Sequence, residues 1–158
     1  MREIILYKNK GIVLIDNEDF EIISKYKWHN NGCGYAKTSI KINNKWVNVY
    51  MPHIILNIPK NIFIDHIDGN PLNNQKENLR IVTNSQNQMN SKKQKNTISK
   101  FKGVSWDKGR KRFVACIKLN NKSCSLGRFK SEIDAAKAYN KKAKELYGEF
   151  ANLNIIEE

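Results

Sequence analysis

The segment from Ile64 to Asn90 constrains the fold most, because it sets turn signals and polar side chains between short apolar runs. The run 62–64 ends at Asp65 and His66 and predicts the end of a strand. Residues 68–71 (Asp-Gly-Asn-Pro) predict a turn, since Gly accepts positive φ and Pro fixes its own. Residues 78–82 predict a second strand, and the residues after it can cap a short helix. The segment therefore predicts strand, turn, strand and helix.

This arrangement brings a carboxylate, an imidazole and side-chain amides toward one end of the segment. Carboxylate and amide oxygens are hard ligands that suit Mg²⁺. A neutral imidazole beside them is suited to act as a general base at neutral pH. The alternative is an Asn-rich surface turn that contains a hydrogen-bonded histidine.

The segment resembles the ββα-metal motif of HNH endonucleases, in the variant common in phage and intron-encoded homing enzymes. The resemblance rests on Asp65-His66, Asn78 and Asn87, within a run that covers about a sixth of the chain. It implies that His66 activates the attacking water and that Asn78 holds the imidazole in its working orientation. It also implies that Asp65 and Asn87 bind one divalent cation, with Mg²⁺ or Mn²⁺ favoured over Zn²⁺ because Asn87 stands where other variants have His.

Positive charge is concentrated in one block of the chain. The net charge is +13, and residues 91–130 hold 13 Lys and Arg side chains against one acid, Asp107. Such a block is typical of a module that binds nucleic acid. The alternative, a solubilising or disordered tail, is disfavoured by the aromatic and β-branched residues within the block.

Other features of the composition exclude several classes of protein. The three cysteines are scattered, so they indicate neither a disulfide framework nor a structural zinc site. The N-terminus lacks the apolar run of a signal peptide, and no stretch is long enough to span a membrane. We therefore expect an intracellular protein that is not secreted, in the cytoplasm of a bacterial or phage-infected host.

Residues 1–60 predict a β-rich lead-in to the motif. Apolar runs at 4–7 and 12–15 predict two strands, Asn17 is expected to start a short helix through Tyr26, and residues 35–42 and 45–50 predict a hairpin around Asn43-Asn44. This segment resembles the N-terminal part of HNH homing proteins. His53 does not stand where those proteins have a histidine, so we leave it out of the catalytic set.

Residues 101–154 predict a second unit after a basic linker at 91–100. Strand patterns at 101–106, 112–119 and 123–129 predict a three-stranded antiparallel meander. Ser131 is expected to cap a helix whose apolar positions begin with Ile133 and which ends at Gly148. Small residues on the helix would let it pack closely on the sheet.

The second unit resembles the plant ethylene-response-factor (APETALA-type) DNA-binding domain. The residues that carry the resemblance are Phe101-Lys102-Gly103-Val104, the strands at 112–117 and 126–129, and Ala135-Ala136-Lys137-Ala138-Tyr139. In that family the sheet lies in the major groove, and by position Lys102 and Lys118 match two contact sites. Ser105 stands where an Arg is expected, and Trp106 with the basic cluster at 108–112 is expected to compensate. The residues predicted to contact DNA are Lys102, Ser105, Trp106, Lys108, Arg110, Lys111, Arg112, Lys118 and Lys122.

Taken together, the sequence predicts an α+β protein: an HNH (ββα-metal) module at 1–90, a linker at 91–100 and the DNA-binding domain at 101–154. The predicted activity is hydrolysis of phosphodiester bonds in duplex DNA by a metal-dependent homing endonuclease, acting as a monomer or as a dimer on DNA, with no membrane partner. Two alternatives stay open: a DNA-binding regulator with an inactive HNH motif, and a nonspecific DNA-packaging protein.

Overall fold

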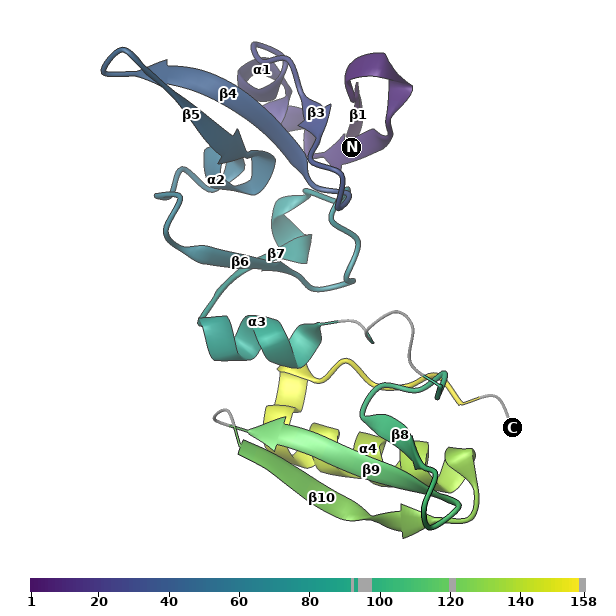
Figure 1. The fold of residues 1–158 in the computed structure, drawn as a ribbon. Coiled ribbons are helices and arrows are strands. Elements are labelled where there is room, and N and C mark those ends of the chain that lie inside the picture. Colours follow the sequence, from purple (N-terminus) through teal and green to yellow (C-terminus); the bar gives the residue numbers. More distant parts are fainter. Residues whose placement is uncertain (92, 94–97, 120–121, 157–158) are drawn as a thin grey trace. The chain divides into compact units, whose positions relative to one another are not determined.

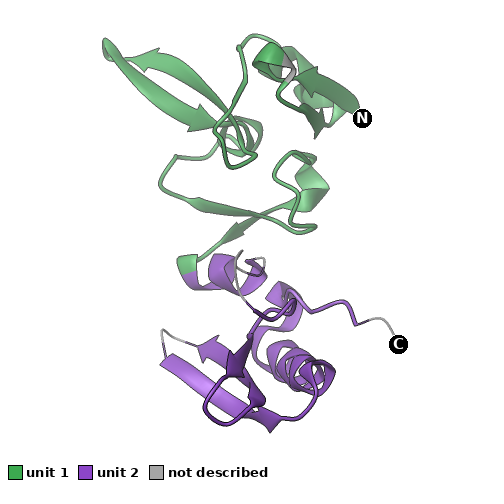
Figure 2. Ribbon diagram, turned by 45° about the vertical axis from the view of Figure 1, so that its right-hand side comes forward, with its two compact units in different colours: residues 1–84 green, residues 85–158 purple. Residues whose placement is uncertain are grey.

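The computed structural model describes every residue except 92, 94–97, 120–121 and 157–158. The chain divides into two compact units, Met1–Asn84 and Ser85–Glu158 (Figure 2). Each unit combines small antiparallel sheets or ribbons with short helices (Figure 1), which confirms the mixed α+β class. Part of the predicted linker, at 92 and 94–97, lies outside the described residues, and so do residues 120–121 between two of the predicted strands.

The first unit begins with the ribbon of strands β1 (Arg2–Ile5) and β2 (Ile12–Ile15). The 3-10 helix η1 (Tyr7–Asn9) lies between them, so the first strand ends before Tyr7 rather than at it as predicted. Val13 and Ile15 of β2 are fully buried. Alternation along β2 therefore directs one apolar face into the core.

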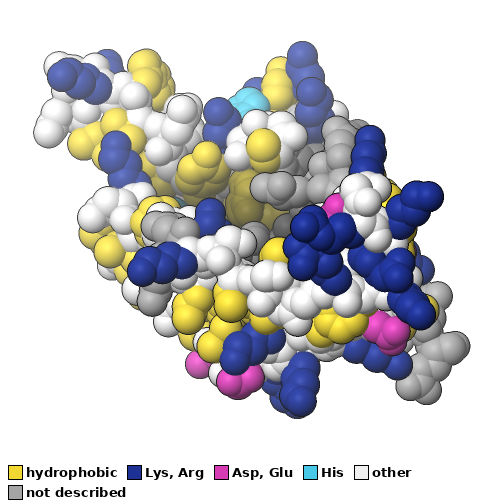
Figure 3. Space-filling model, turned by 60° about the horizontal axis from the view of Figure 1, so that its bottom comes forward, with side chains coloured by type: hydrophobic (Ala, Val, Ile, Leu, Met, Phe, Trp, Pro, Cys, Tyr) yellow, Lys and Arg dark blue, Asp and Glu magenta, His cyan; other side chains and the backbone are white. Residues whose placement is uncertain are grey.

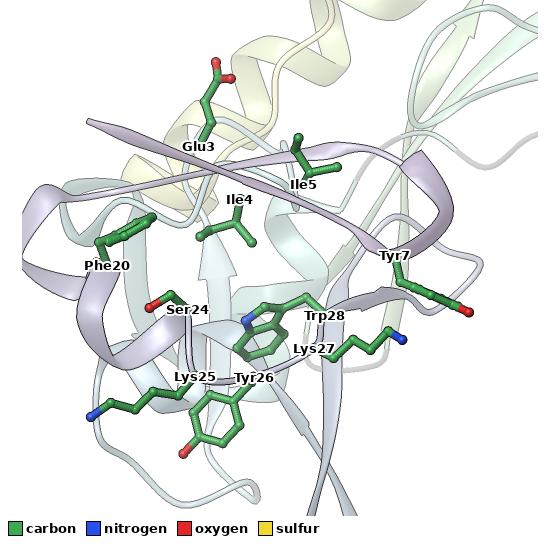
Figure 4. A pocket seen from close by; sticks show the side chains of 10 residues that line it. All are labelled: Glu3, Ile4, Ile5, Tyr7, Phe20, Ser24, Lys25, Tyr26, Lys27 and Trp28. Carbon is green, nitrogen blue, oxygen red and sulfur yellow. The ribbon is translucent and has the colours of Figure 1, made fainter.

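The helix predicted from Asn17 to Tyr26 is shorter than expected. It consists of the 3-10 helix η2 (Asn17–Asp19) and α1 (Phe20–Ile23). The carbonyl of Ile23 accepts from the Tyr26 backbone N–H at 3.2 Å and from the Trp28 indole Nε1 at 2.8 Å. These bonds turn the chain away from the helix axis, and they bury Trp28 beneath Ile4 of β1 in the groove that Figure 4 shows. Hydrogen bonds from residues three and five positions further on thus close the end of the helix.

The next elements form a sheet in the order β3 (His29–Asn30), β4 (Ala36–Ile42) and β5 (Lys45–Tyr50). The predicted hairpin is confirmed: Asn43 and Asn44 have φ angles of 47° and 61° and join β4 to β5. Left-handed φ at both turn residues matches the twist of the two strands. α2 (Met51–Ile55) follows, with Pro52 in its first turn.

The segment with the predicted motif forms β6 (Phe63–His66), the 3-10 helix η3 (Lys76–Asn78) and β7 (Leu79–Val82). β6 and β7 pair antiparallel, with Asp65 opposite Arg80 and His66 opposite Leu79. Leu79 joins the apolar core of the first unit. The core thus reaches the strand next to His66.

The second unit contains a three-stranded sheet in the order β10-β9-β8, formed by β8 (Val104–Asp107), β9 (Arg112–Leu119) and β10 (Lys122–Phe129). α4 (Glu132–Tyr147) packs on this sheet, and the 3-10 helix η4 (Gly148–Phe150) follows it. The Ser131 hydroxyl accepts from the N–H groups of Ile133 and Asp134, as the capping prediction requires. Ile133, the first apolar position predicted for the helix, is 41% exposed, while Ala135 and Ala136 are fully buried.

One close contact fixes α4 on the sheet of the second unit. Gly103 has a φ of +74°, and a Cβ placed there would stand 2.1 Å from the Tyr139 ring and 2.8 Å from the Cys116 carbonyl oxygen. The Tyr139 ring is buried and the carbonyl belongs to β9, so neither can move aside easily. Gly103 is therefore required by both space and backbone conformation.

We expect Gly103→Ala to lower the free energy of unfolding by about 2–4 kcal/mol, because it adds overpacking to backbone strain. Gly148→Ala is the matched control, since Gly148 has a φ of +54° and a Cβ added there would meet no atom within 4 Å. Thermal and denaturant unfolding of both variants would measure the difference. Equal losses in the two variants would show that the Tyr139 contact adds nothing.

Candidate active site and nucleic-acid interface

His66 is a buried histidine at the end of β6, only 6% exposed. Its Nε2 lies 3.4 Å from Oδ1 of Asn74, a residue with no exposed surface. Asn74 is held in turn, since its backbone N–H donates to the Leu14 carbonyl at 2.8 Å and its Nδ2 donates to the Pro71 carbonyl at 3.2 Å. The amide oxygen that meets the imidazole is therefore fixed by bonds to β2 and to the turn.

Burial lowers the pKa of His66 below its ordinary value of 6.5, because a charged imidazole would lose its hydration. The hydrogen bond to Asn74 and the carboxylates of Asp68 and Asp65 act in the opposite direction but do not reverse the shift. His66 is therefore neutral at neutral pH. A neutral imidazole has a nitrogen that can accept a proton, as a general base must.

Asn78 closes the turn that follows His66. Its Oδ1 accepts from the backbone N–H of Asp68 at 3.0 Å, and its Nδ2 donates to the Asp68 carboxylate at 3.0 Å and to the Asn73 carbonyl at 2.8 Å. The hydrogen bond described for the imidazole joins His66 Nε2 to the amide oxygen of Asn74 and does not involve Asn78. Asn78 thus shapes the backbone next to His66, and its direct hold on the imidazole stays a prediction. Asn74 was not among the predicted site residues, although the Asn73-Asn74 pair just after the predicted turn was an available signal.

Asp65 lies beside His66 on β6 and forms a buried ion pair with Arg80 of β7. Oδ2 of Asp65 accepts from Arg80 Nε at 2.9 Å and from Nη2 at 2.8 Å. The two side chains are 8% and 14% exposed. Arg80 was not among the predicted site residues, because its position opposite Asp65 follows only from the register of the two strands.

Asn87 lies on α3 (Asn84–Asn90), which the structure assigns to the second unit from Ser85 onward. Its position relative to Asp65 is not determined, because the two residues belong to separate units. Within the second unit the end of α3 is held firmly: Lys102 Nζ donates to the carbonyls of Met89 at 2.7 Å and Ser91 at 2.5 Å, and Asn152 Nδ2 donates to the Asn90 carbonyl at 2.9 Å. α3 is therefore joined to the predicted DNA-binding domain.

Burial lowers the pKa of the Lys102 ammonium from 10.5 to about 8. The predicted DNA contact at Lys102 must compete with its two bonds to α3. A positive charge at the carboxyl end of a helix also interacts favourably with the helix dipole. The structure thus gives Lys102 a structural task within the second unit.

The outer face of the second sheet carries most of the other predicted DNA contacts. Strand alternation places Ser105, Arg112 and Lys118 on the face opposite the α4 core, while Lys108, Arg110, Lys111 and Lys122 lie in or next to the turns. Lys and Arg side chains crowd the face seen in Figure 3, with few acids between them. This distribution suits a polyanion.

Two residues of this sheet differ from the prediction. Trp106 lies on the same side as buried Val104, and its ring packs on Phe113 with centroids 4.7 Å apart, so the strand does not present it with the outer-face lysines. Arg128 of β10 does lie on the outer face, opposite Val114, and forms an ion pair with Asp107 at 3.6 Å. Arg110 and Arg128 also lower the pKa of the Asp107 carboxyl, with the Arg110 backbone N–H as the largest cause.

The buried carboxylate near His66 has the chemistry of a ligand for a hard cation. The described residues contain no group of three His, Cys, Asp or Glu side chains that could form a metal cage. Asp65 supplies a buried carboxylate whose orientation Arg80 fixes, as partners of metal-binding carboxylates commonly do. A carboxylate with an amide oxygen and water fits Mg²⁺ or Mn²⁺.

A buried histidine that directly follows an aspartate, at the end of a two-stranded ribbon closed by asparagine amides, is the arrangement expected of an HNH motif. The chain belongs to the HNH endonuclease family, and its nuclease part is fused to an AP2-type DNA-binding domain. The family model for HNH endonuclease matches residues 57–89, and the model for the AP2 domain matches residues 99–149.

Three curated relatives support this assignment. An uncharacterized HNH endonuclease of Acanthamoeba polyphaga mimivirus is 34% identical over 156 residues, which cover 97% of this chain and 80% of the relative. Protein 3.8 of Escherichia phage T7 is 36% identical over 94 residues, or 60% of this chain and 77% of the relative. The "SPbeta prophage-derived putative HNH homing endonuclease" of Bacillus subtilis (strain 168) is 49% identical over 66 residues, or 38% of each chain. No solved structure matches.

Among the described residues, no helix is long and apolar enough to cross a membrane.

Lys102 and Lys118 should respond differently when each is changed to Met. Each phosphate contact contributes about 0.9 to the slope of log affinity against log salt. Lys118→Met should therefore reduce the slope by about 0.9, the contribution of one phosphate contact, because Lys118 is exposed on the outer face. Lys102→Met should leave it unchanged, because the Lys102 ammonium is bonded to α3. Titration of a duplex at several salt concentrations would measure both slopes, and equal reductions would show that Lys102 contacts phosphate.

Proposed function

We propose that this chain is a divalent-metal-dependent homing endonuclease that hydrolyses phosphodiester bonds in duplex DNA. The observation that carries the proposal is the burial of His66 in its neutral form beside Asp65. Membership of the HNH endonuclease family supports the nuclease activity, and the prophage-derived relative, by its name, supports the homing role.

In this proposal His66 accepts a proton from the attacking water. The water attacks phosphorus in line with the leaving oxygen, which leaves a 5′-phosphate and a 3′-hydroxyl end. The hydrogen bond between His66 Nε2 and Asn74 Oδ1 holds the ring plane, and burial keeps the imidazole ready to accept a proton. Asn78 supports this geometry from the turn, through its bonds to Asp68 and Asn73.

Asp65 is the proposed carboxylate ligand of Mg²⁺ or Mn²⁺, and Asn87 of α3 is the proposed amide ligand. A bound cation would stabilise negative charge on the scissile phosphate and on the departing 3′ oxygen. Arg80 orients the Asp65 carboxylate toward one rotamer. The outer face of the second sheet is proposed to hold the duplex, with lysines on phosphates and a few base contacts selecting the site.

The ion pair between Asp65 and Arg80 is the one observation that favours the alternative, a DNA-binding regulator with an inactive motif. An arginine bound to the carboxylate neutralises the charge that would attract a cation. The two proposals therefore predict different effects of removing Arg80 on metal-stimulated cleavage. They also differ in whether the wild-type chain cuts DNA.

We expect His66→Gln to reduce the cleavage rate by about 10²- to 10⁴-fold, because a general base contributes that much to a hydrolytic step. Duplex affinity should stay close to that of the wild type, since the basic residues that hold the duplex lie mainly in residues 91–130. Single-turnover nicking of supercoiled plasmid and a binding titration would measure the two effects. His29→Gln is the control, because His29 packs on Tyr7 away from the Asn74 hydrogen bond. Cleavage by the His66 variant at the wild-type rate would remove His66 from the mechanism.

Excess chelator should stop cleavage and leave duplex binding intact. Asp65→Asn should abolish the response of the rate to added Mg²⁺, because the ligand loses its charge.

Arg80→Met should lower the activity by about 10- to 100-fold if Arg80 orients the ligand. A rise in metal-stimulated cleavage in the Arg80 variant would instead show that the ion pair blocks the site, as the regulator proposal requires.

A further inference from the structure

The hairpin of β4 and β5 has two unlike faces. Register pairs Lys37 with Tyr50, Ser39 with Asn48 and Lys41 with Trp46, and these six residues share one face because side chains alternate along each strand. We call this set the ribbon face. The opposite face carries Thr38, Ile40, Val47 and Val49, of which Thr38 is buried and the others are half-buried.

The ribbon face is open to solvent and rich in groups that bind nucleic acid. Trp46 is 73% exposed, an unusual state for the largest apolar side chain. The Ser39 hydroxyl donates to Asn48 Oδ1 at 2.8 Å, which fixes the orientation of that amide. Within the described part of the chain the Asn48 Nδ2 has no other hydrogen bond, so its N–H groups remain as donors.

The hairpin lies in a stretch of sequence whose charge has one sign. Residues 22–64 contain six lysines and no Asp or Glu, although the chain outside residues 91–130 is nearly neutral as a whole. None of these six lysines forms an ion pair among the described residues. Basic charge of one sign with an exposed aromatic ring favours an anionic partner that also offers apolar contacts, as a DNA duplex does in its major groove.

Aromatic contacts connect the ribbon face to His66 within the first unit. The rings of Tyr50 and Tyr35 are 6.2 Å apart, and those of Tyr35 and His66 are 5.9 Å apart. Tyr35 and Tyr50 are 42% and 39% exposed, so this path lies at the surface. A strand of DNA with its scissile phosphate at His66 would therefore meet the ribbon face next.

We propose that the ribbon face is a second DNA-binding surface, which holds the duplex beside the bond that is hydrolysed. A two-stranded antiparallel ribbon fits the major groove of B-DNA, where Asn48 can donate to base edges and Lys37 and Lys41 can reach phosphates. The inference rests on the proposed function for the location of the scissile phosphate. Both units would then contribute to the free energy of DNA binding, rather than the second unit alone.

Two cross-strand pairs at the end of the hairpin provide a matched experiment. Lys41 pairs with Trp46 on the ribbon face, and Ile42 pairs with Lys45 on the opposite face. The Trp46 and Ile42 side chains are 73% and 47% exposed, so neither change opens a cavity. The full-length variants Lys41→Gln/Trp46→Ser and Ile42→Ser/Lys45→Gln remove the same charge and one exposed apolar side chain each.

We expect the ribbon-face variant to bind a duplex about tenfold more weakly and to lose about 0.9 from its salt slope, because it loses one phosphate contact and one apolar contact of Trp46 in the groove. Hydroxyl-radical footprinting should show lost protection on one side of the cleavage position, with a lower kcat/KM for nicking. The opposite-face variant should resemble the wild type in every measurement. Unfolding temperatures of both variants would verify that the hairpin remains folded.

Equal slopes and footprints in the two variants would overturn the proposal. So would a change in sedimentation of the ribbon-face variant with unchanged DNA binding, because that result would identify a self-association surface. If the wild-type chain binds DNA but cuts none with any divalent metal, the proposed function fails. In that case the footprint and the salt slope would still test whether the ribbon face binds DNA.

Discussion

The backbone of Leu14 supports the arrangement on which the candidate active site depends. Its N–H donates to the Leu72 carbonyl and its carbonyl accepts from the Asn74 N–H, both at 2.8 Å. These bonds join a strand near the N-terminus to the turn between β6 and β7. They place the Asn74 amide against His66 without a large core around the site. In a unit of this size, a few hydrogen bonds of backbone and side-chain amides thus fix the position of a site residue, which a larger protein achieves by packing.

The helix that carries the proposed amide ligand is bonded to the DNA-binding domain. Lys102 and Asn152 occupy three carbonyl groups at the end of α3, and Met89 packs on the apolar cluster around Ile117 and Tyr139. A seven-residue helix is too short to be stable by itself in water. The second unit therefore supplies the order of α3.

Several features could be predicted from the sequence because they depend on neighbouring residues. The hairpin at Asn43-Asn44, the Ser131 cap, and the strands on either side of the motif turn follow from local turn chemistry and alternation. His66 and Asp65 were identified from the motif. Their burial side by side is consistent with that prediction, while their catalytic roles stay predictions.

Other features depended on residues far apart in the sequence, and only the tertiary structure decided them. Arg80 meets Asp65 only through the register of β6 and β7. Asn74 reaches His66 because Leu14 holds its backbone. The Lys102 ammonium donates to the Met89 carbonyl of α3, although its charge and position predicted a DNA contact. Local sequence thus determined which elements form, whereas the partner of each polar side chain was set by which segments the fold brings within hydrogen-bond distance, because burial requires those groups to be paired.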